Sequence, residues 1–149
     1  MSNTYLFMLL ALVAGAMMPT QAATNNKMAI IVDSPILSAF ISFLVGTVAL
    51  FIYVLVSGVS IANFASSKEA PAIAWVGGLL GAFFVTAAVL LVPRLGVAMT
   101  FSLIIAGQMI ATLIIDHFGL LGVPIKEVSF ARIGGILLIA AGVVLIRRY

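Results

Sequence analysis

The chain has 149 residues, of which 64% are hydrophobic and only 7% are charged, and its formal net charge is +3. Soluble domains carry roughly a quarter of their residues charged, so this composition excludes a soluble globular protein and indicates an integral membrane protein. The small basic excess forms no cluster that would predict nucleic-acid binding. The absence of cysteine excludes disulfides and thiolate metal sites.

Five apolar stretches are each long enough to cross a bilayer, which takes about 20 helical residues. We predict membrane helices over residues 5–26, 35–62, 72–92, 97–118 and 129–148, in a single transmembrane domain of residues 1–149. The connections are too short to hold a soluble catalytic domain. No phosphate-binding loop of the P-loop type and no His-Glu metal motif occurs. We therefore expect no enzymatic activity, no cofactor and no metal site.

The first stretch resembles a signal peptide in hydropathy, but the four residues before it contain no Lys or Arg, so we expect a retained helix. Pro19 lies inside it and removes one backbone donor. Gln21 and Asn25 follow four residues apart and share a face. An interrupted helix with two amides beyond the break predicts substrate binding by Gln21 and Asn25. The alternative is a simple proline kink with a polar exit from the bilayer.

The second stretch begins at Ser34 and Pro35, a pair typical of a helix start. Ser38, Ser42 and Gly46 then form a stripe of small residues. Close helix packing explains the stripe well. Because Ser42 also carries a hydroxyl, it is a further candidate for substrate contact.

Glycines predict helix packing in the third and fifth stretches. Gly77 and Gly81 have the spacing that lets two backbones approach, although this motif is common. The interior of the fifth stretch has no polar side chain, while Gly134, Gly135 and Gly142 leave room for a neighbouring helix. We expect these five glycines to pack or dimerise rather than to contact substrate.

The fourth stretch carries Gln108, Thr112 and Asp116 at intervals of four residues, so the three share one helix face. Polar side chains inside a membrane are costly and often functional. Gln108 lies deepest, and we predict that Gln108 and Thr112 contact substrate. Interhelical hydrogen bonding is an equally suitable role and does not exclude the first.

Asp116 and His117 lie near the end of the fourth stretch. A carboxylate there is suited to hold a proton or cation, and histidine titrates near neutral pH, so the pair is a candidate for coupling or gating. The alternative is a helix cap or an ion pair with Lys126. No Glu lies within any apolar stretch, so the embedded carboxylate common in proton-coupled multidrug pumps is absent apart from Asp116.

The basic residues divide almost evenly between the two sides that five crossings create. Three lie on the N-terminal side: Lys68, Lys126 and Arg132. Four lie on the other side: Lys27, Arg94, Arg147 and Arg148. Membrane proteins orient themselves by concentrating Lys and Arg in cytoplasmic loops. This balance is compatible with insertion in both orientations, and also with a weak bias that leaves the C-terminal side cytoplasmic.

Several short motifs occur in order along the whole chain: Pro19-Thr20-Gln21 with Asn25, Ser34-Pro35, Ser42-Phe43-Leu44-Val45-Gly46-Thr47, Gly77-Gly78-Leu79-Leu80-Gly81, Pro93-Arg94-Leu95-Gly96, Gly107-Gln108 and Asp116-His117-Phe118-Gly119. As a set they resemble the YdcZ-like family of small bacterial inner-membrane proteins, in the drug/metabolite transporter superfamily. The resemblance implies a multi-pass inner-membrane protein whose five-helix units pair antiparallel into ten helices. The partner is a second copy of the chain or an oppositely oriented paralogue.

The resemblance also implies an exporter, and it transfers no functional residue. We therefore predict a secondary transporter that exports small organic metabolites or amphipathic compounds by alternating access between two antiparallel subunits in lipid. Because few fixed charges line its helices, neutral or charge-delocalised substrates suit it best. Two alternatives stand: a small dual-topology channel for an ion or small neutral solute, and a non-transporting subunit of another membrane complex.

Overall fold

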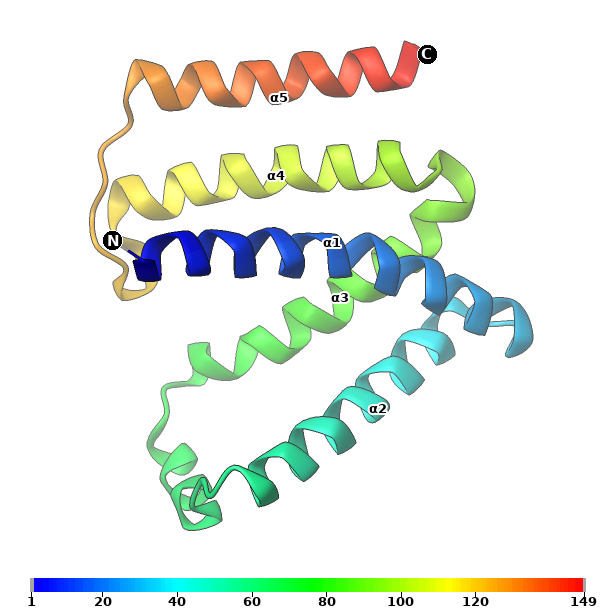
Figure 1. The fold of residues 1–149 in the computed structure, drawn as a ribbon, viewed down its shortest axis with the longest axis vertical. Helices are drawn as coiled ribbons and strands as arrows, with labels where there is room; N and C mark the ends of the chain where they lie inside the picture. Colours follow the sequence, from blue (N-terminus) through cyan, green and yellow to red (C-terminus); the bar gives the residue numbers. More distant parts are fainter. Residues whose placement is uncertain (1, 149) are drawn as a thin grey trace. The chain divides into compact units, whose positions relative to one another are not determined.

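The computed structural model describes residues 2–148, and within this range every long element is a helix (Figure 1). The long helices are α1 (Ser2–Ile31), α2 (Pro35–Val56), α3 (Ala72–Leu95), α4 (Val97–Phe118) and α5 (Phe130–Arg148). Two short 3-10 helices, η1 (Ile61–Glu69) and η2 (Leu120–Gly122), lie in connections. Each of the five long helices is apolar and long enough to cross a bilayer. The all-α class with five membrane helices is therefore confirmed.

Three helix ends differ from the sequence prediction. α1 continues five residues further, to Ile31. α2 ends at Val56, six residues early, because Gly58 adopts a left-handed backbone conformation (φ +74°) that ends the helix inside an apolar run. α3 continues through Pro93 to Leu95, since one missing backbone donor in the last turn does not stop a helix that is already formed.

The chain divides into two compact units, residues 1–93 and 94–149. In the first unit, a tight turn connects α1 to α2. Asp33 takes a left-handed conformation (φ +50°), and the Ser34 N–H donates to the Ala29 carbonyl at 3.1 Å, which closes α1. The Ser34 hydroxyl oxygen then accepts from the Leu37 N–H at 3.2 Å, and Pro35 occupies the first turn of α2. The chain thereby reverses, and α1 and α2 pack as a hairpin.

The core of the first unit is small. Ala39 of α2 packs with Val85 and Val89 of α3, and all three are buried. Ala29 of α1 packs against this cluster. In lipid, apolar burial gives little driving force for helix association, so side-chain packing and interhelical hydrogen bonds hold these helices together.

The second unit is a helical hairpin of α4 and α5, which lie side by side in Figure 1. Gly119 ends α4 in a left-handed conformation (φ +59°), and its N–H points to the Asp116 and Ile115 carbonyls. A Cβ added at Gly119 would lie 2.6 Å from Ile125 Cγ1, so this position requires glycine. The Lys126 N–H also donates to the Asp116 carbonyl, at 2.8 Å, and draws the following loop back onto α4.

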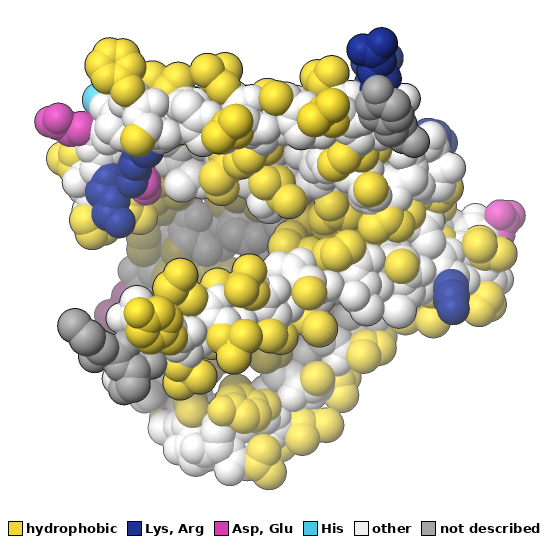
Figure 2. Space-filling model, turned by 45° about the horizontal axis from the view of Figure 1, so that its top comes forward, with side chains coloured by type: hydrophobic (Ala, Val, Ile, Leu, Met, Phe, Trp, Pro, Cys, Tyr) yellow, Lys and Arg dark blue, Asp and Glu magenta, His cyan; other side chains and the backbone are white. Residues whose placement is uncertain are grey.

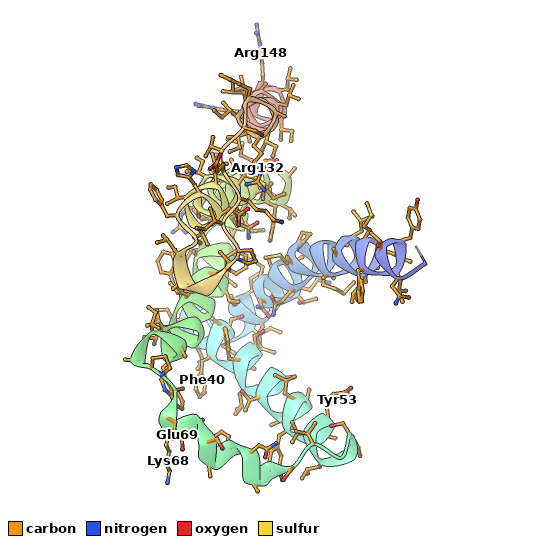
Figure 3. The ribbon with its side chains drawn as sticks, turned by 90° about the vertical axis from the view of Figure 1, so that its left-hand side faces the viewer. Phe40, Tyr53, Lys68, Glu69, Arg132 and Arg148 are labelled. Atoms are coloured by element: carbon orange, nitrogen blue, oxygen red, sulfur yellow. The ribbon has the colours of Figure 1, made fainter. Side chains whose placement is uncertain are left out.

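The outer surface of both units is largely apolar, as Figure 2 shows for one face. Side chains such as Phe83 and Leu138 are each 76% exposed. Charged side chains lie near helix ends and in connections, and Figure 3 shows Lys68 and Glu69 on η1 and Arg148 at the end of α5. A surface of this kind needs lipid or another membrane helix to cover it.

Candidate functional site

A polar groove lies between α1 and α2. We call it the amide groove; its cavity of about 280 Å³ is lined by Gln21, Thr24, Asn25, Met28, Ser38, Ile41, Ser42 and Val45. Gln21 with Asn25, and Ser38 with Ser42, lie four residues apart, so each pair shares a helix face. With Thr24, the groove lining contains two amides and three hydroxyls. The Ser38 hydroxyl donates to the backbone carbonyl of Asn25 at 2.6 Å and joins the two helices. A second hollow of about 210 Å³ extends along α2 past Gln21 and Ser42.

Asn25 is the most enclosed amide of the groove. It is only 7% exposed, and its Nδ2 atom is buried without a hydrogen-bond partner among the described residues. The next residue behaves differently, because Asn26 Nδ2 donates to the Ala22 carbonyl at 3.1 Å. Buried polar groups nearly always find a partner, so the unused donor of Asn25 needs a physical explanation.

The sequence suggested that Gln21 and Asn25 lie beside an interruption of the first helix, but the groove does not arise in that way. α1 is continuous from Ser2 to Ile31 with Pro19 inside it. The Thr20 hydroxyl donates to the Ala16 carbonyl at 2.9 Å within the same helix. Gln21 and Asn25 face a cavity because α2 packs beside them, and the interpretation of Pro19 as a helix break is wrong.

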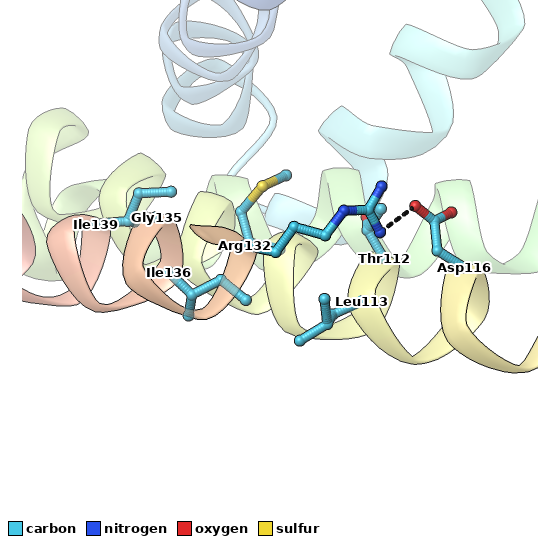
Figure 4. A pocket seen from close by; sticks show the side chains of 8 residues that line it. Thr112, Leu113, Asp116, Arg132, Gly135, Ile136 and Ile139 are labelled. Carbon is cyan, nitrogen blue, oxygen red and sulfur yellow. Dashed lines mark hydrogen bonds and ion pairs between the residues drawn. The ribbon is translucent and has the colours of Figure 1, made fainter. Parts of the chain in front are cut away.

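The second unit contains a different hollow, between α4 and α5 (Figure 4). We call it the ion-pair pocket; its cavity of about 310 Å³ is lined by Met109, Thr112, Leu113, Asp116, Arg132, Gly135, Ile136 and Ile139. Arg132 Nη1 donates to Asp116 Oδ2 at 3.1 Å and to the Lys126 carbonyl at 3.3 Å. The side chains of Arg132 and Asp116 are 35% and 23% exposed, so this salt bridge is partly buried.

The geometry corrects one sequence-based alternative for this region, the ion pair of Asp116 with Lys126. Asp116 pairs with Arg132 rather than with Lys126, which contributes only backbone atoms. The side chain of Thr112 lines the ion-pair pocket, and its hydroxyl donates to the Gln108 carbonyl at 2.7 Å. The hydroxyl proton of Thr112 is therefore used within α4, and substrate contact by Thr112 stays a prediction.

His117 and Gln108 lie outside the ion-pair pocket lining. The His117 Nδ1 atom accepts from the Val128 N–H at 3.4 Å, and its ring meets Phe118 edge-on at a centroid distance of 4.8 Å. His117 thus holds the loop after α4. The Gln108 residue is exposed. Substrate contact by Gln108 and coupling or gating by His117 stay predictions.

Among the glycines predicted to pack helices, Gly81 makes a close approach within the chain. A Cβ added there would lie 3.3 Å from Cζ of Phe43 on α2. Added Cβ atoms at Gly77, Gly134, Gly135 and Gly142 would meet no atom within 4 Å. Packing by those four stays a prediction that requires another partner.

Sequence reasoning missed Ser38 and Arg132 as site residues. The spacing of Ser38 and Ser42 placed both on one helix face, but the stripe was assigned to packing. Arg132 was counted only as a loop charge, although it lies in the first turn of α5. The signal was an Asp in the last turn of one helix and an Arg in the first turn of the next, because antiparallel neighbours bring such ends together.

Among the described residues, no group of three or more His, Cys, Asp or Glu side chains is suited to hold a metal ion.

Comparison with known proteins explains the apolar helices. The sequence model of the family described as "Putative inner membrane exporter, YdcZ" matches residues 6–145. The chain belongs to this family. It is 37% identical over 73 residues to "Inner membrane protein YdcZ" of Escherichia coli (strain K12), which covers 49% of this chain and 48% of that protein. The aligned part thus spans about half the length of this relative. No solved structure matches the chain.

The family resemblance seen in the sequence is therefore confirmed, and so is the location. With five helices capable of crossing a bilayer and membership in an inner-membrane family, the chain is a multi-pass protein of the bacterial inner membrane.

Proposed function

We propose that the chain is a secondary transporter that exports small organic metabolites or amphipathic compounds and leaves them chemically unchanged. The observation that carries the proposal is its membership, over residues 6–145, in a family described as an inner-membrane exporter. The amide groove supports it, because this cavity offers amides and hydroxyls beside apolar side chains, as small-molecule sites do.

The charges of the two hollows support this substrate class. Among the described residues, none that lines the amide groove is charged. In the ion-pair pocket, the charges of Asp116 and Arg132 compensate each other at 3.1 Å. Burying a charged substrate without an opposite charge is costly in an apolar setting. Neutral or charge-delocalised compounds therefore suit this protein better than strongly charged ones.

The functional unit in this proposal is an antiparallel homodimer of ten helices. The nearly equal distribution of Lys and Arg, three against four, gives only a weak orientation signal. The broad apolar surface of each unit can be covered by a second copy as well as by lipid. An oppositely oriented paralogue would meet the same requirements.

If all five long helices cross the bilayer, chain order alone gives the two polar hollows opposite membrane surfaces. Ser38 lies about 6 Å along α2 from its N-cap Ser34, at about 1.5 Å of rise per residue, near the α1–α2 turn. Asp116 lies in the last turn of α4, beside the α4–α5 loop. Because these two connections are separated by three crossings, they face opposite sides. In an antiparallel dimer, each membrane surface then has one amide groove and one ion-pair pocket.

This symmetry suggests how alternating access works. Two inverted copies have two equivalent states, related by exchange of their conformations, which open the binding region to one side and then the other. Exchange between the two states moves substrate across the bilayer, and no chemical step is required.

Topology is tested by single cysteines, which the cysteine-free chain makes specific. Ser66 lies in η1 and Leu95 ends α3, and both residues are exposed. Ser66→Cys and Leu95→Cys proteins are treated with an impermeant thiol reagent in intact cells. Partial labelling at both positions supports dual insertion. Labelling at one position alone, with full labelling of the other after lysis, contradicts the homodimer.

Transport is tested in proteoliposomes with radiolabelled benzamide, a small neutral amphipathic probe. Saturable uptake that is accelerated by unlabelled benzamide inside the vesicles is the expected result. Flux that never saturates, without counterflow, would identify a channel. Folded Asn25→Ala and Gln108→Ala proteins should transport more slowly; wild-type rates in both would refute these binding assignments.

A further inference from the structure

The amide groove contains a donor that the protein itself does not use. Asn25 is 93% buried, judged from its exposed fraction of 7%, and its Nδ2 atom has no acceptor among the described residues. The backbone of the same residue is held in place, because its main-chain carbonyl accepts from the Ser38 hydroxyl at 2.6 Å. A buried donor without a partner, on a residue that lines a cavity, can meet a ligand acceptor once its amide turns toward that cavity.

Neighbouring polar groups of the groove are partly committed to other bonds. The Ser38 proton is given to Asn25, and the Thr24 hydroxyl donates to the Gln21 carbonyl at 2.8 Å. Both hydroxyl oxygens keep lone pairs that can accept. Asn25 Nδ2 is the buried donor without a partner in this groove, while the exposed Gln21 amide and the Ser42 hydroxyl are further groups without a described hydrogen bond.

Apolar side chains complete the cavity. Met28, Ile41 and Val45 line it together with the polar residues, and its volume is about 280 Å³. This volume lies just below the range for small-molecule sites, roughly 300–1,000 Å³. A compact ligand with one polar end and one apolar part fits these walls.

We propose that the amide groove binds neutral compounds through a carbonyl or amide oxygen, which accepts a hydrogen bond from Asn25 Nδ2 while the apolar part packs on Met28, Ile41 and Val45. This inference deepens the proposed export function, because it assigns the chemical group by which a substrate is recognised. Carboxylates and ammonium groups bind poorly here, since no side chain of opposite charge lines the groove.

The test uses purified full-length protein and three aromatic probes of similar shape: benzamide, benzoate and benzylammonium. We expect saturable benzamide binding by ligand-detected NMR, and weaker binding of the two charged probes. Asn25→Leu keeps a similar side-chain size but removes the donor, so benzamide affinity should fall about tenfold. Asn26→Leu is the matched control, because Asn26 already bonds to Ala22, and it should retain wild-type affinity.

Stability separates a ligand site from a purely structural amide. Without a probe, Asn25→Leu should raise the melting temperature, because it removes an unsatisfied buried donor. Three results would overturn the inference: no benzamide binding, equal affinity in wild type and Asn25→Leu, or loss of the dimer in Asn25→Leu with unchanged benzamide affinity. The last would show that a second copy supplies the acceptor.

The experiment also distinguishes this inference from the proposed function. Binding is measured in detergent and needs neither transport nor a particular orientation. Asn25-dependent benzamide binding without counterflow would support the binding site and contradict the export function. Counterflow that is insensitive to Asn25→Leu would support the export function and contradict the binding site.

Discussion

The α1–α2 and α4–α5 hairpins both hold polar groups among apolar side chains, but they satisfy them differently. In the α4–α5 hairpin, Asp116 and Arg132 neutralise each other, and Arg132 donates to a backbone carbonyl as well. In the α1–α2 hairpin, the Nδ2 atom of Asn25 stays unpaired although it is buried. The first arrangement contributes to structure, whereas the second leaves binding capacity unused. Replacement of Asn25 and replacement of Arg132 should therefore change the melting temperature in opposite directions.

The largest loss of stability is expected from a substitution at the end of α4. Gly119→Ala should destabilise the protein by about 2–3 kcal/mol, because alanine is strained at φ +59° and its Cβ would meet Ile125. Thermal unfolding in detergent measures this loss. Gly15→Ala is the control, since an added Cβ there meets nothing within 4 Å. Equal melting temperatures for the two variants would contradict the described loop.

The next effect concerns the salt bridge. Arg132→Met should destabilise by about 1–2 kcal/mol, because it leaves the Asp116 carboxylate partly buried and unpaired, while partial exposure of both side chains limits the loss. The charge-neutral double variant Asp116→Asn with Arg132→Met should recover part of the stability. A double variant as unstable as the sum of the two single variants would show that the pair is not coupled.

A smaller loss is expected between α1 and α2. Ser38→Ala removes the hydroxyl that donates to the Asn25 carbonyl, and it should cost about 0.5–1.5 kcal/mol. Ser42→Ala is the matched control, one turn along the same face and without a described hydrogen bond, so its melting temperature should stay near wild type. A larger loss of stability in Ser42→Ala than in Ser38→Ala would contradict the hydrogen bond from Ser38 to the Asn25 backbone.

The smallest effect separates packing within the chain from packing between copies. Gly81→Ala should change stability by less than about 1 kcal/mol, because the tip of the Phe43 ring can shift by a few tenths of an ångström. Gly77→Ala, with open space around it, should be at least as stable in the monomer. If Gly77→Ala instead disrupts the dimer in crosslinking, Gly77 contacts the second copy.

Much of the fold was predictable from sequence because hydropathy alone identifies helices that must satisfy their backbone groups in lipid. The bounds 97–118 agree with the structure, since Gly96 and Gly119 mark both ends of α4. The end of α2 was not evident from hydropathy, because Val59 and Ile61 continue the apolar pattern beyond Gly58, with only Ser57 and Ser60 as polar residues in this stretch. A left-handed glycine changes the backbone without changing the hydropathy.

The site was predictable in part. Spacing of four placed Gln21 with Asn25, and Thr112 with Asp116, on common faces, and each pair does line one hollow. The partners across each hairpin, Ser38 and Arg132, depend on how two helices are rotated against each other, which periodicity within one helix does not determine. The unpaired state of Asn25 Nδ2 is likewise a property of three-dimensional packing.

The most direct measurement compares the melting temperatures of purified Asn25→Leu and Arg132→Met proteins with wild type, in the absence of any probe. The structure predicts opposite signs. Asn25→Leu should be more stable, by about 1 kcal/mol or more, because an unsatisfied buried donor is removed, and Arg132→Met should be less stable, because a satisfied pair is broken. A lower melting temperature for both variants would show that Asn25 is a structural residue and would contradict the binding role of the amide groove.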